Sequence, residues 1–309
     1  MPNYSGSWNL VQQMQATAAG NWTTPPAVGA IGIFALGYNG SSSLTTRNKY
    51  TFQSDVNSGA TAATTASYGG SAAGNSTVGI FALGLISCAV STTRNKYIYL
   101  GCVVSSATAA SAASAYGSAT GNSTVGIFAL GYNGSTGLTT RDKYTYSGCV
   151  VASATASSAN SCSGAAAGTS TVGIFALSSA GTTRNKYTYS GDTNATATAS
   201  SANSCGGAAA GNSTVGIFAL GSAGTTRNKY TYSGDTNATA TASSAGSILG
   251  SAAGNSTIGI FALGGVCGSY STTRNKYTYS GDTNGTATAA SAGSFGQSAA
   301  SNGTTGVNV

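Results

Sequence analysis

The chain has 309 residues, of which only 6% are charged, against roughly 25% in an average soluble protein. Apolar residues nevertheless make up 41%, which excludes the highly charged and weakly apolar composition of a disordered chain. No apolar run approaches the ~18 residues that a membrane-spanning helix needs. We therefore expect a soluble, folded chain with no membrane insertion.

The net charge of +7 comes from one repeated motif. All twelve Lys and Arg lie in copies of TTR-x-KY, at Arg47 and Lys49, Arg94 and Lys96, Arg141 and Lys143, Arg184 and Lys186, Arg227 and Lys229, and Arg274 and Lys276. A nucleic-acid-binding protein concentrates its cations in a patch, tail or helix. The even spacing here indicates a structural element of each repeat and predicts no nucleic-acid partner.

The repeat has the period of a propeller blade. The segment GIFAL recurs with its Phe at positions 34, 81, 128, 175, 218 and 261, so neighbouring copies are 43 or 47 residues apart. This is the range of a four-stranded propeller blade. In the fourth unit, four short β-like segments alternate with turn-forming residues, at 170–177, 182–189, 195–200 and 205–210. None has the length or period of a helix.

The end of the chain repeats the approach to the first unit. Residues 298–307, SAASNGTTGV, match the SAAGNSTVGI sequence that precedes other GIFAL segments, so they can complete the first unit and close a ring. Closure removes exposed sheet edges. The sequence therefore predicts an all-β fold, a six-bladed β-propeller of four-stranded blades over residues 30–309, preceded by a short N-terminal arm, residues 1–29. An open β-solenoid or a fibrous trimer is the alternative.

Side chains alternate across the TTR-x-KY segment. In the fourth unit Arg184 and Lys186 fall on one face, and Tyr187 and Tyr189 fall on the other. The tyrosine pairs are expected to supply most of the apolar area between blades. A buried Arg needs partners, for which backbone carbonyls, tyrosine hydroxyls and the Asp of the SGD turn are candidates. The Ala/Thr/Ser segment is expected near the axis, where blades approach closely.

Catalytic chemistry is poorly supported. The chain contains no His and no Glu, which removes the usual general bases, the carboxylate pair of most glycosidases and nearly all zinc sites. Asp142 is predicted to form an ion pair with the cations beside it. The other four Asp share one turn position, at Asp55, Asp192, Asp235 and Asp282. We predict no enzyme activity, no metal and no cofactor.

The six cysteines are predicted to be free thiols. Cys102 and Cys149 take the turn position of the Asp residues in the second and third units, and Cys162 and Cys205 share another turn position. A disulfide requires Cα atoms about 4.4–6.8 Å apart, which equivalent points on neighbouring blades reach only close to the axis. No CxxC spacing indicates a metal site.

Binding is expected where the repeats differ. Between FAL and TTR, units four and five have four residues, whereas units one, two, three and six have eight. Since unit six adjoins unit one in a ring, the longer hairpins are predicted to form an unbroken crescent on one face. Exposed Tyr and Asn among Gly and Ser suit a protein surface or a sugar, and docking to a protein is the favoured use. The candidate binding residues are Tyr38, Asn39, Tyr132, Asn133, Val266 and Tyr270.

The first 29 residues lie outside the repeat. Trp8, Val11 and Met14 can line one side of a short helix and, with Trp22, are candidate docking residues. The arm is predicted to pack on the ring or to attach the protein to a larger assembly.

Two stretches of the sequence resemble known proteins. The GIFALG and TTR-x-KYTYSGDT units resemble kelch-like propeller repeats of phage tail-associated and cyanobacterial proteins, and the opening SGSWNLVQQMQATAAGNW is similar to a Trp-containing segment of phage tail and fibre proteins. The resemblance implies a virion structural protein of a tail fibre, baseplate or neck appendage. Its implied partners are other virion proteins, further copies of itself and host-surface glycans. An extracellular cyanobacterial surface or filament-forming protein is the alternative.

Overall fold

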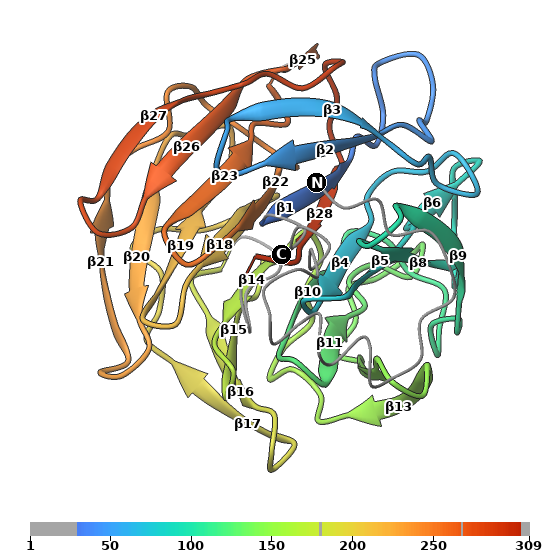
Figure 1. Ribbon diagram of the computed structural model, residues 1–309. Coiled ribbons are helices and arrows are strands. Elements are labelled where there is room, and N and C mark those ends of the chain that lie inside the picture. The colour runs from blue at the N-terminus through green and yellow to red at the C-terminus, as the bar shows by residue number, and fades with distance from the viewer. Residues whose placement is uncertain (1–29, 179–180, 267, 304–309) are drawn as a thin grey trace, which may run out of the picture.

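Six four-stranded antiparallel sheets surround a central axis in the computed structural model, which describes residues 30–178, 181–266 and 268–303 (Figure 1). Every regular element in these ranges is a strand. The predicted all-β, six-bladed propeller is confirmed. The arm residues Trp8, Val11, Met14 and Trp22 lie outside the described residues, as does Cys267.

The blades are numbered along the chain, and each is given from its innermost to its outermost strand. Blade 1 contains β28 (Ser298–Ser301), β1 (Ile31–Ala35), β2 (Arg47–Thr51) and β3 (Val56–Ala60), and blade 2 contains β4 (Ser71–Gly74), β5 (Val78–Ala82), β8 (Arg94–Ile98) and β9 (Val103–Ala107). Blade 3 contains β10 (Ser118–Gly121), β11 (Val125–Ala129), β12 (Arg141–Thr145) and β13 (Val150–Ala154), and blade 4 contains β14 (Ala165–Gly168), β15 (Val172–Ala176), β16 (Arg184–Thr188) and β17 (Thr193–Ala197). Blade 5 contains β18 (Ala208–Gly211), β19 (Val215–Ala219), β20 (Arg227–Thr231) and β21 (Thr236–Ala240), and blade 6 contains β22 (Ser251–Gly254), β23 (Ile258–Ala262), β26 (Arg274–Thr278) and β27 (Thr283–Ala287).

Strands from opposite ends of the described chain meet in blade 1. β28 pairs antiparallel with β1, with Ala300 opposite Ile33, and Figure 1 shows the red strand beside the blue one. Asn302 extends this junction, because its Oδ1 accepts the N–H of Ile31 at 2.7 Å. β28 thus supplies the innermost strand of the blade that the first repeat begins.

Small side chains let the innermost strands approach the axis. All four residues of β18, Ala-Ala-Ala-Gly, are buried, and neighbouring innermost strands contact one another around the ring. The expectation that the Ala/Thr/Ser segment lies near the axis is wrong. Thr193–Ala197 is β17, the outermost strand of blade 4, with three of its five residues exposed. Its alternation of Ala and Thr is that of an edge strand with one face in solvent.

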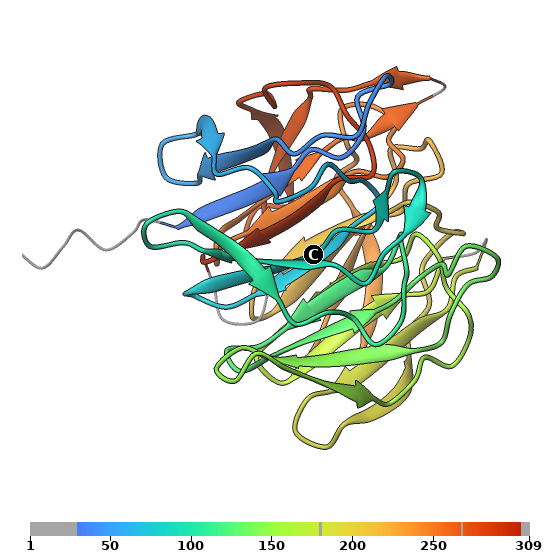
Figure 2. The same cartoon turned by 90° about the vertical axis from the view of Figure 1, so that its right-hand side faces the viewer.

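An apolar cluster fills each of the six junctions between blades. At the junction of blades 4 and 5, Ile174 and Ala167 of blade 4 pack against Phe218 and Tyr230 of blade 5. Equivalent residues form the clusters at the other five junctions. Burying a side chain such as Phe218 stabilises the fold by about 1.5–3 kcal/mol. Figure 2 shows the ring from the side, with the strands running between its two faces.

One buried Arg crosses each junction. The Cζ of Arg184 in blade 4 lies 4.6 Å from the ring centroid of Phe218 in blade 5. Its Nη2 and Nη1 donate to the Oδ1 atoms of Asn228 and Asn237 at 3.2 and 2.8 Å. Burial lowers the pKa of Arg184 to about 10, so the group is still charged at neutral pH. The partners predicted for the buried Arg residues are therefore largely wrong. Side-chain amides and aromatic ring faces of the next blade take the place of tyrosine hydroxyls and the turn Asp. Backbone carbonyls accept from the Arg side chain at 3.4 Å in two junctions.

The turn Asp instead joins the outer parts of neighbouring blades. The Oδ2 of Asp192 lies 3.2 Å from the Nζ of Lys143 in blade 3. Its Oδ1 accepts the N–H of Thr155 at 2.8 Å and the hydroxyl of Tyr187 in its own blade. We call this arrangement the Asp clamp, and it recurs at Asp55, Asp235 and Asp282. The shared turn position predicted for these four residues is confirmed, with φ between 46° and 53°, which Asp tolerates better than most residues.

Asp142 forms an ion pair with a neighbouring blade. Its Oδ2 lies 2.8 Å from the Nη2 of Arg94 in blade 2, and both side chains are fully buried. The N–H of Ser111 also donates to Oδ2, at 3.0 Å. The predicted pair with the adjacent cations is wrong, because strand alternation places Asp142 on the opposite face from Arg141 and Lys143.

The prediction of free thiols is confirmed for four of the described cysteines: Cys88, Cys102, Cys149 and Cys205.

Candidate functional site

The long connections lie on one face of the ring, which we call the hairpin face. Blade 2 carries a hairpin of β6 (Leu85–Ile86) and β7 (Ala89–Val90), and blade 6 carries one of β24 (Gly265–Val266) and β25 (Ser269–Tyr270). The connections of blades 1 and 3 are held by single bridges. The crossovers into blades 1, 2, 3, 5 and 6 each pair with the connection of the blade that they enter, as Tyr68 does with Leu85.

The six candidate binding residues lie on the hairpin face but do not form one cluster. Tyr38 and Tyr270 come together, with ring centroids 6.2 Å apart. Tyr132 lies two blades from Tyr38, and its hydroxyl donates to the carbonyl oxygen of Gly134 at 2.6 Å. Val266 is half-buried in β24.

Asn39 and Asn133 shape the turns in which they lie. The Oδ1 of Asn39 accepts the N–H groups of Ser41 and Ser42 at 3.0 and 2.9 Å. Asn133 accepts the corresponding N–H groups of its own turn at 3.0 and 2.8 Å. Both residues are exposed, but each amide oxygen is committed to its turn, as is common for Asn. Their role in binding stays a prediction.

Five aromatic rings form a patch where blade 1 meets blades 6 and 2. Tyr38 lies 5.5 Å from Tyr68 and 5.6 Å from Phe295 between ring centroids. Phe295 stacks on Tyr270 at 5.4 Å, and Tyr68 lies 6.3 Å from Tyr116. All five residues are half-buried. We call them the aromatic patch.

Sequence reasoning missed three members of the aromatic patch, Tyr68, Tyr116 and Phe295. They lie in the crossovers, just before the innermost strands β4, β10 and β28. Cys162 and Cys205 occupy the position of Tyr68 and Phe295 in other blades. The change of residue type at this position from one repeat to the next was the sequence signal that could have found these residues.

A closed cycle of backbone hydrogen bonds surrounds the central axis at the hairpin face. In this cycle, each residue's N–H donates to the carbonyl oxygen of the equivalent residue in the preceding crossover. The N–H of Tyr116 donates to Gly69 at 2.6 Å, and the N–H of Gly69 donates to Gly296 at 2.7 Å, which closes the cycle. All members have φ between 54° and 65°. The cycle consists of Gly69, Tyr116, Ser163, Gly206, Leu249 and Gly296.

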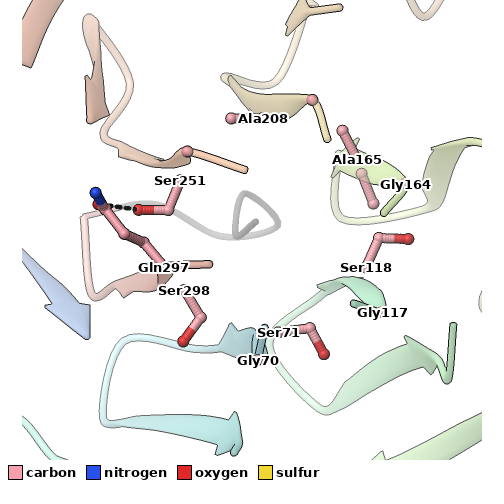
Figure 3. A pocket seen from close by; sticks show the side chains of 13 residues that line it. Gly70, Ser71, Gly117, Ser118, Gly164, Ala165, Ala208, Ser251, Gln297 and Ser298 are labelled. Atoms are coloured by element: carbon pink, nitrogen blue, oxygen red, sulfur yellow. Dashed lines mark hydrogen bonds between the residues drawn. The ribbon is translucent and has the colours of Figure 1, made fainter. Parts of the chain in front are cut away.

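A small cavity lies on the axis next to this cycle. Its volume is about 40 Å³, and Figure 3 shows its lining. Blades 4 and 5 contribute Ala165 and Ala208, and Ser251 of blade 6 donates to the Oε1 of Gln297 at 3.2 Å. Ser298, Ser71 and Ser118 line it from blades 1, 2 and 3. A cavity of this size holds a few water molecules and no organic substrate.

A wider hollow of about 450 Å³ opens between blades 5 and 6, near Lys229 and Tyr279. The junction of blades 3 and 4 has the same residue types at the equivalent positions. It therefore belongs to the repeated blade surface and does not distinguish one blade from another.

Tyr68 and Tyr116 of the aromatic patch stay protonated at neutral pH. Burial raises the pKa of Tyr68, and the adjacent Cys88 thiol raises it further. Burial also raises the pKa of Tyr116, with Tyr68 adding to the effect. These two tyrosines therefore contribute neutral hydroxyls and not a base.

The Asp carboxylates form ion pairs that join neighbouring blades. Burial alone would raise the pKa of Asp192, but the N–H of Thr155, the hydroxyl of Tyr187 and Lys143 outweigh it and lower the pKa to about 2. Asp55 behaves in the same way. Such carboxylates are poor general acids and bases near pH 7. The described part of the chain contains no group of three His, Cys, Asp or Glu side chains placed to hold a metal ion. In the same ranges no helix has the length and apolar character needed to cross a membrane.

The architecture defines a six-bladed β-propeller, and solved structures share it. One is reported as "Structure of YjhT", which is 10% identical, covers 78% of this chain and 93% of its own, and superposes with a TM-score of 0.60. Another is TolB from Acinetobacter baumannii, also 10% identical, which covers 93% of this chain and 69% of its own with a TM-score of 0.61. At this identity the likeness concerns the fold alone. No protein-family model and no curated protein matches the chain.

Proposed function

We propose that this chain is a non-catalytic structural protein of a phage virion, in which the propeller is a rigid platform and the aromatic patch docks onto another virion protein. The aromatic patch carries the proposal. The repeats share their strands and junctions, and four of the six have the Asp clamp. Tyr116 and Tyr270 have no aromatic counterpart in another blade, and Tyr68 and Phe295 share a position that is not aromatic in the other four blades, whereas Tyr38 is matched by Tyr132 in blade 3. Large side chains that depart from the repeat pattern on one face of the ring favour a contact with a partner molecule.

The chemistry of the patch favours a protein partner over a sugar. Interface centres are rich in Tyr and Phe and poor in charge, and the patch contains no charged residue. A sugar site needs several convergent polar groups. Here the hydroxyl of Tyr38 donates to the carbonyl oxygen of Gly40 at 3.1 Å, and the Oδ1 of Asn39 holds its own turn. A host-surface glycan is thus the weaker candidate.

The rest of the molecule suits a platform. Every junction combines an apolar cluster with a buried Arg, and the five Asp are engaged in ion pairs between blades. Placement in a virion is supported by the resemblance of the repeat and of the opening segment to phage tail-associated proteins. An extracellular cyanobacterial protein is the competing placement.

Purified phage particles provide the test. We expect mass spectrometry to find the chain in particles, and we expect Tyr38→Ala/Tyr270→Ala to reduce its incorporation at least tenfold. Tyr132→Ala, on the hairpin face but outside the patch, is the matched control and should incorporate normally. Absence from particles, or normal incorporation of the double variant, would contradict the proposal. Binding to a glycan array that depends on Tyr38 and Tyr270 would replace the protein partner with a sugar.

A further inference from the structure

Blades 2 and 3 have a cysteine where the other blades have the Asp of the clamp. Cys102 and Cys149 have φ of 54° and 52°, the same left-handed conformation as Asp55, Asp192, Asp235 and Asp282. The backbone contact of the clamp is also kept, because Thr61 and Thr108 donate their hydroxyls to the carbonyl oxygens of Cys102 and Cys149. Thr155 makes the same contact with Asp192. The site is therefore built alike in all six blades, and one side chain differs.

The groups that bind the carboxylate elsewhere are present around both thiols. Tyr97 and Tyr144 are fully buried, and the hydroxyl of each faces a thiol, whereas the equivalent hydroxyl of Tyr187 in blade 4 donates to the carboxylate of Asp192. Burial raises the pKa of Tyr97, and the neighbouring Cys102 raises it further, which places the thiol beside this hydroxyl. A thiol sulfur is a weak hydrogen-bond acceptor, so each hydroxyl lacks the strong partner that a carboxylate provides.

The cationic part of the clamp is also in place. The Nζ of Lys96 lies 3.8 Å from the Sγ of Cys149. Lys49 occupies the corresponding position in blade 1, next to the blade that contains Cys102. A hydroxyl donor and an ammonium group therefore surround a sulfur atom that accepts hydrogen bonds weakly.

A cysteine sulfinate has the shape and charge that the site lacks. It carries two oxygen atoms and one negative charge on the atom attached to Cβ, as the aspartate carboxylate does. Its oxygens can accept charge-assisted hydrogen bonds from Lys and Tyr. Both thiols are half-buried, so a small peroxide can reach them.

We propose that Cys102 and Cys149 are oxidation sites, and that conversion of each thiol to a sulfinate by a peroxide completes the missing clamps between blades 1, 2 and 3. The thiol first releases its proton to solvent. The thiolate sulfur then attacks one peroxide oxygen, the O–O bond breaks, and sulfenate and water form. A second equivalent of peroxide adds the second oxygen and releases a second water. Sulfur is oxidised in both steps and peroxide oxygen is reduced. Sulfinate formation is not reversed by thiols, so the clamp is permanent.

The test uses hydrogen peroxide and a full-length variant in which the other four cysteines are serine: Cys88, Cys162, Cys205 and Cys267. We expect peptide mass spectrometry to show two added oxygens at Cys102 and Cys149, and the Tm to rise by at least about 2 °C. Adding Cys102→Ser/Cys149→Ser should abolish both effects. Cys102→Asp/Cys149→Asp should have the raised Tm without peroxide.

Two results separate the clamp from a general effect of oxidation. Adding Tyr97→Phe/Tyr144→Phe should leave sulfinate formation intact and reduce the gain in Tm. The proposal is overturned if the sulfinate form has an unchanged or lower Tm, if the Asp variant is less stable than the parent, or if peroxide produces no sulfinate at these positions.

Discussion

Four tyrosine hydroxyls are buried without a partner at the second Tyr of the TTR-x-KYxY segment, directly after the strand, and their removal is expected to stabilise the ring. They belong to Tyr99, Tyr146, Tyr232 and Tyr279. Each lies against its own blade's glycines and an Ala of the preceding blade, as Tyr279 does beside Gly259 and Ala210. The chain contains a natural comparison, because blade 1 has Phe52 at this position, beside Gly32 and Ala253. The site therefore accommodates a Phe ring.

The expected gain follows from the cost of an unpaired group. Burying a hydroxyl without a hydrogen bond costs about 1–3 kcal/mol, and the unfolded chain, whose hydroxyl is hydrated, does not bear this cost. Tyr279→Phe should raise the free energy of unfolding by about 1 kcal/mol. The quadruple Tyr→Phe variant should gain about 4 kcal/mol if the effects in separate blades add.

Urea unfolding measures these changes. Phe52→Tyr is the reverse test and should lower the free energy of unfolding by about 1–3 kcal/mol. Tyr187→Phe is the matched control, since its hydroxyl donates to Asp192 and its loss should destabilise. The reasoning fails if Tyr279→Phe and Tyr99→Phe destabilise the protein, or if Phe52→Tyr stabilises it.

Three further predictions follow from the junctions and from β28. Asp142→Ala should lower the free energy of unfolding by about 3–5 kcal/mol, because it leaves Arg94 buried without its ion pair. Asp142→Asn introduces the residue of the other five blades and should lower it by less than half as much, as measured by urea unfolding. Equal losses in the two variants would contradict this prediction. The pKa of Asp55 and Asp192 falls from 3.8 to about 2 on folding, so their contribution is complete above about pH 4 and is lost as the pH falls through about 2. Tm measured from pH 6 to pH 2 should fall less steeply in Asp192→Asn, and parallel profiles would refute the assignment. Deleting residues 298–309 removes the innermost strand of blade 1 and should abolish cooperative unfolding by circular dichroism; a cooperative transition at the parent Tm would show that β28 is dispensable.

The sequence was sufficient to predict the architecture because the information was local and repeated. The GIFAL and TTR-x-KY segments became strands such as β15 and β16, and the left-handed turn at Asp192 was predictable from its composition. Six copies also allow one strand order to be checked against five others. The period of 43 or 47 residues is typical of a four-stranded propeller blade and therefore predicted the propeller.

The contacts between blades were not predictable in the same way. Alternation shows that Arg184 and Tyr187 point to opposite faces, but it does not show that Arg184 faces Phe218 of the following blade. For Asp142, alternation alone excludes the predicted pair with Arg141 and Lys143, but it does not identify Arg94, 48 residues away, as the partner. The aromatic patch combines crossovers and hairpins from three blades, and Tyr38 meets Phe295 only because the ring closes.

Site-specific photo-cross-linking in intact particles tests the central claim most directly, which is that the aromatic patch contacts another virion protein. The photoreactive residue p-benzoylphenylalanine replaces Tyr270 in the patch or, as a control, Val103 in outermost strand β9, which is 50% exposed. Irradiation should join position 270 to a different virion protein and leave position 103 without that product. No cross-link from position 270, or equal cross-linking from both positions, would contradict the account.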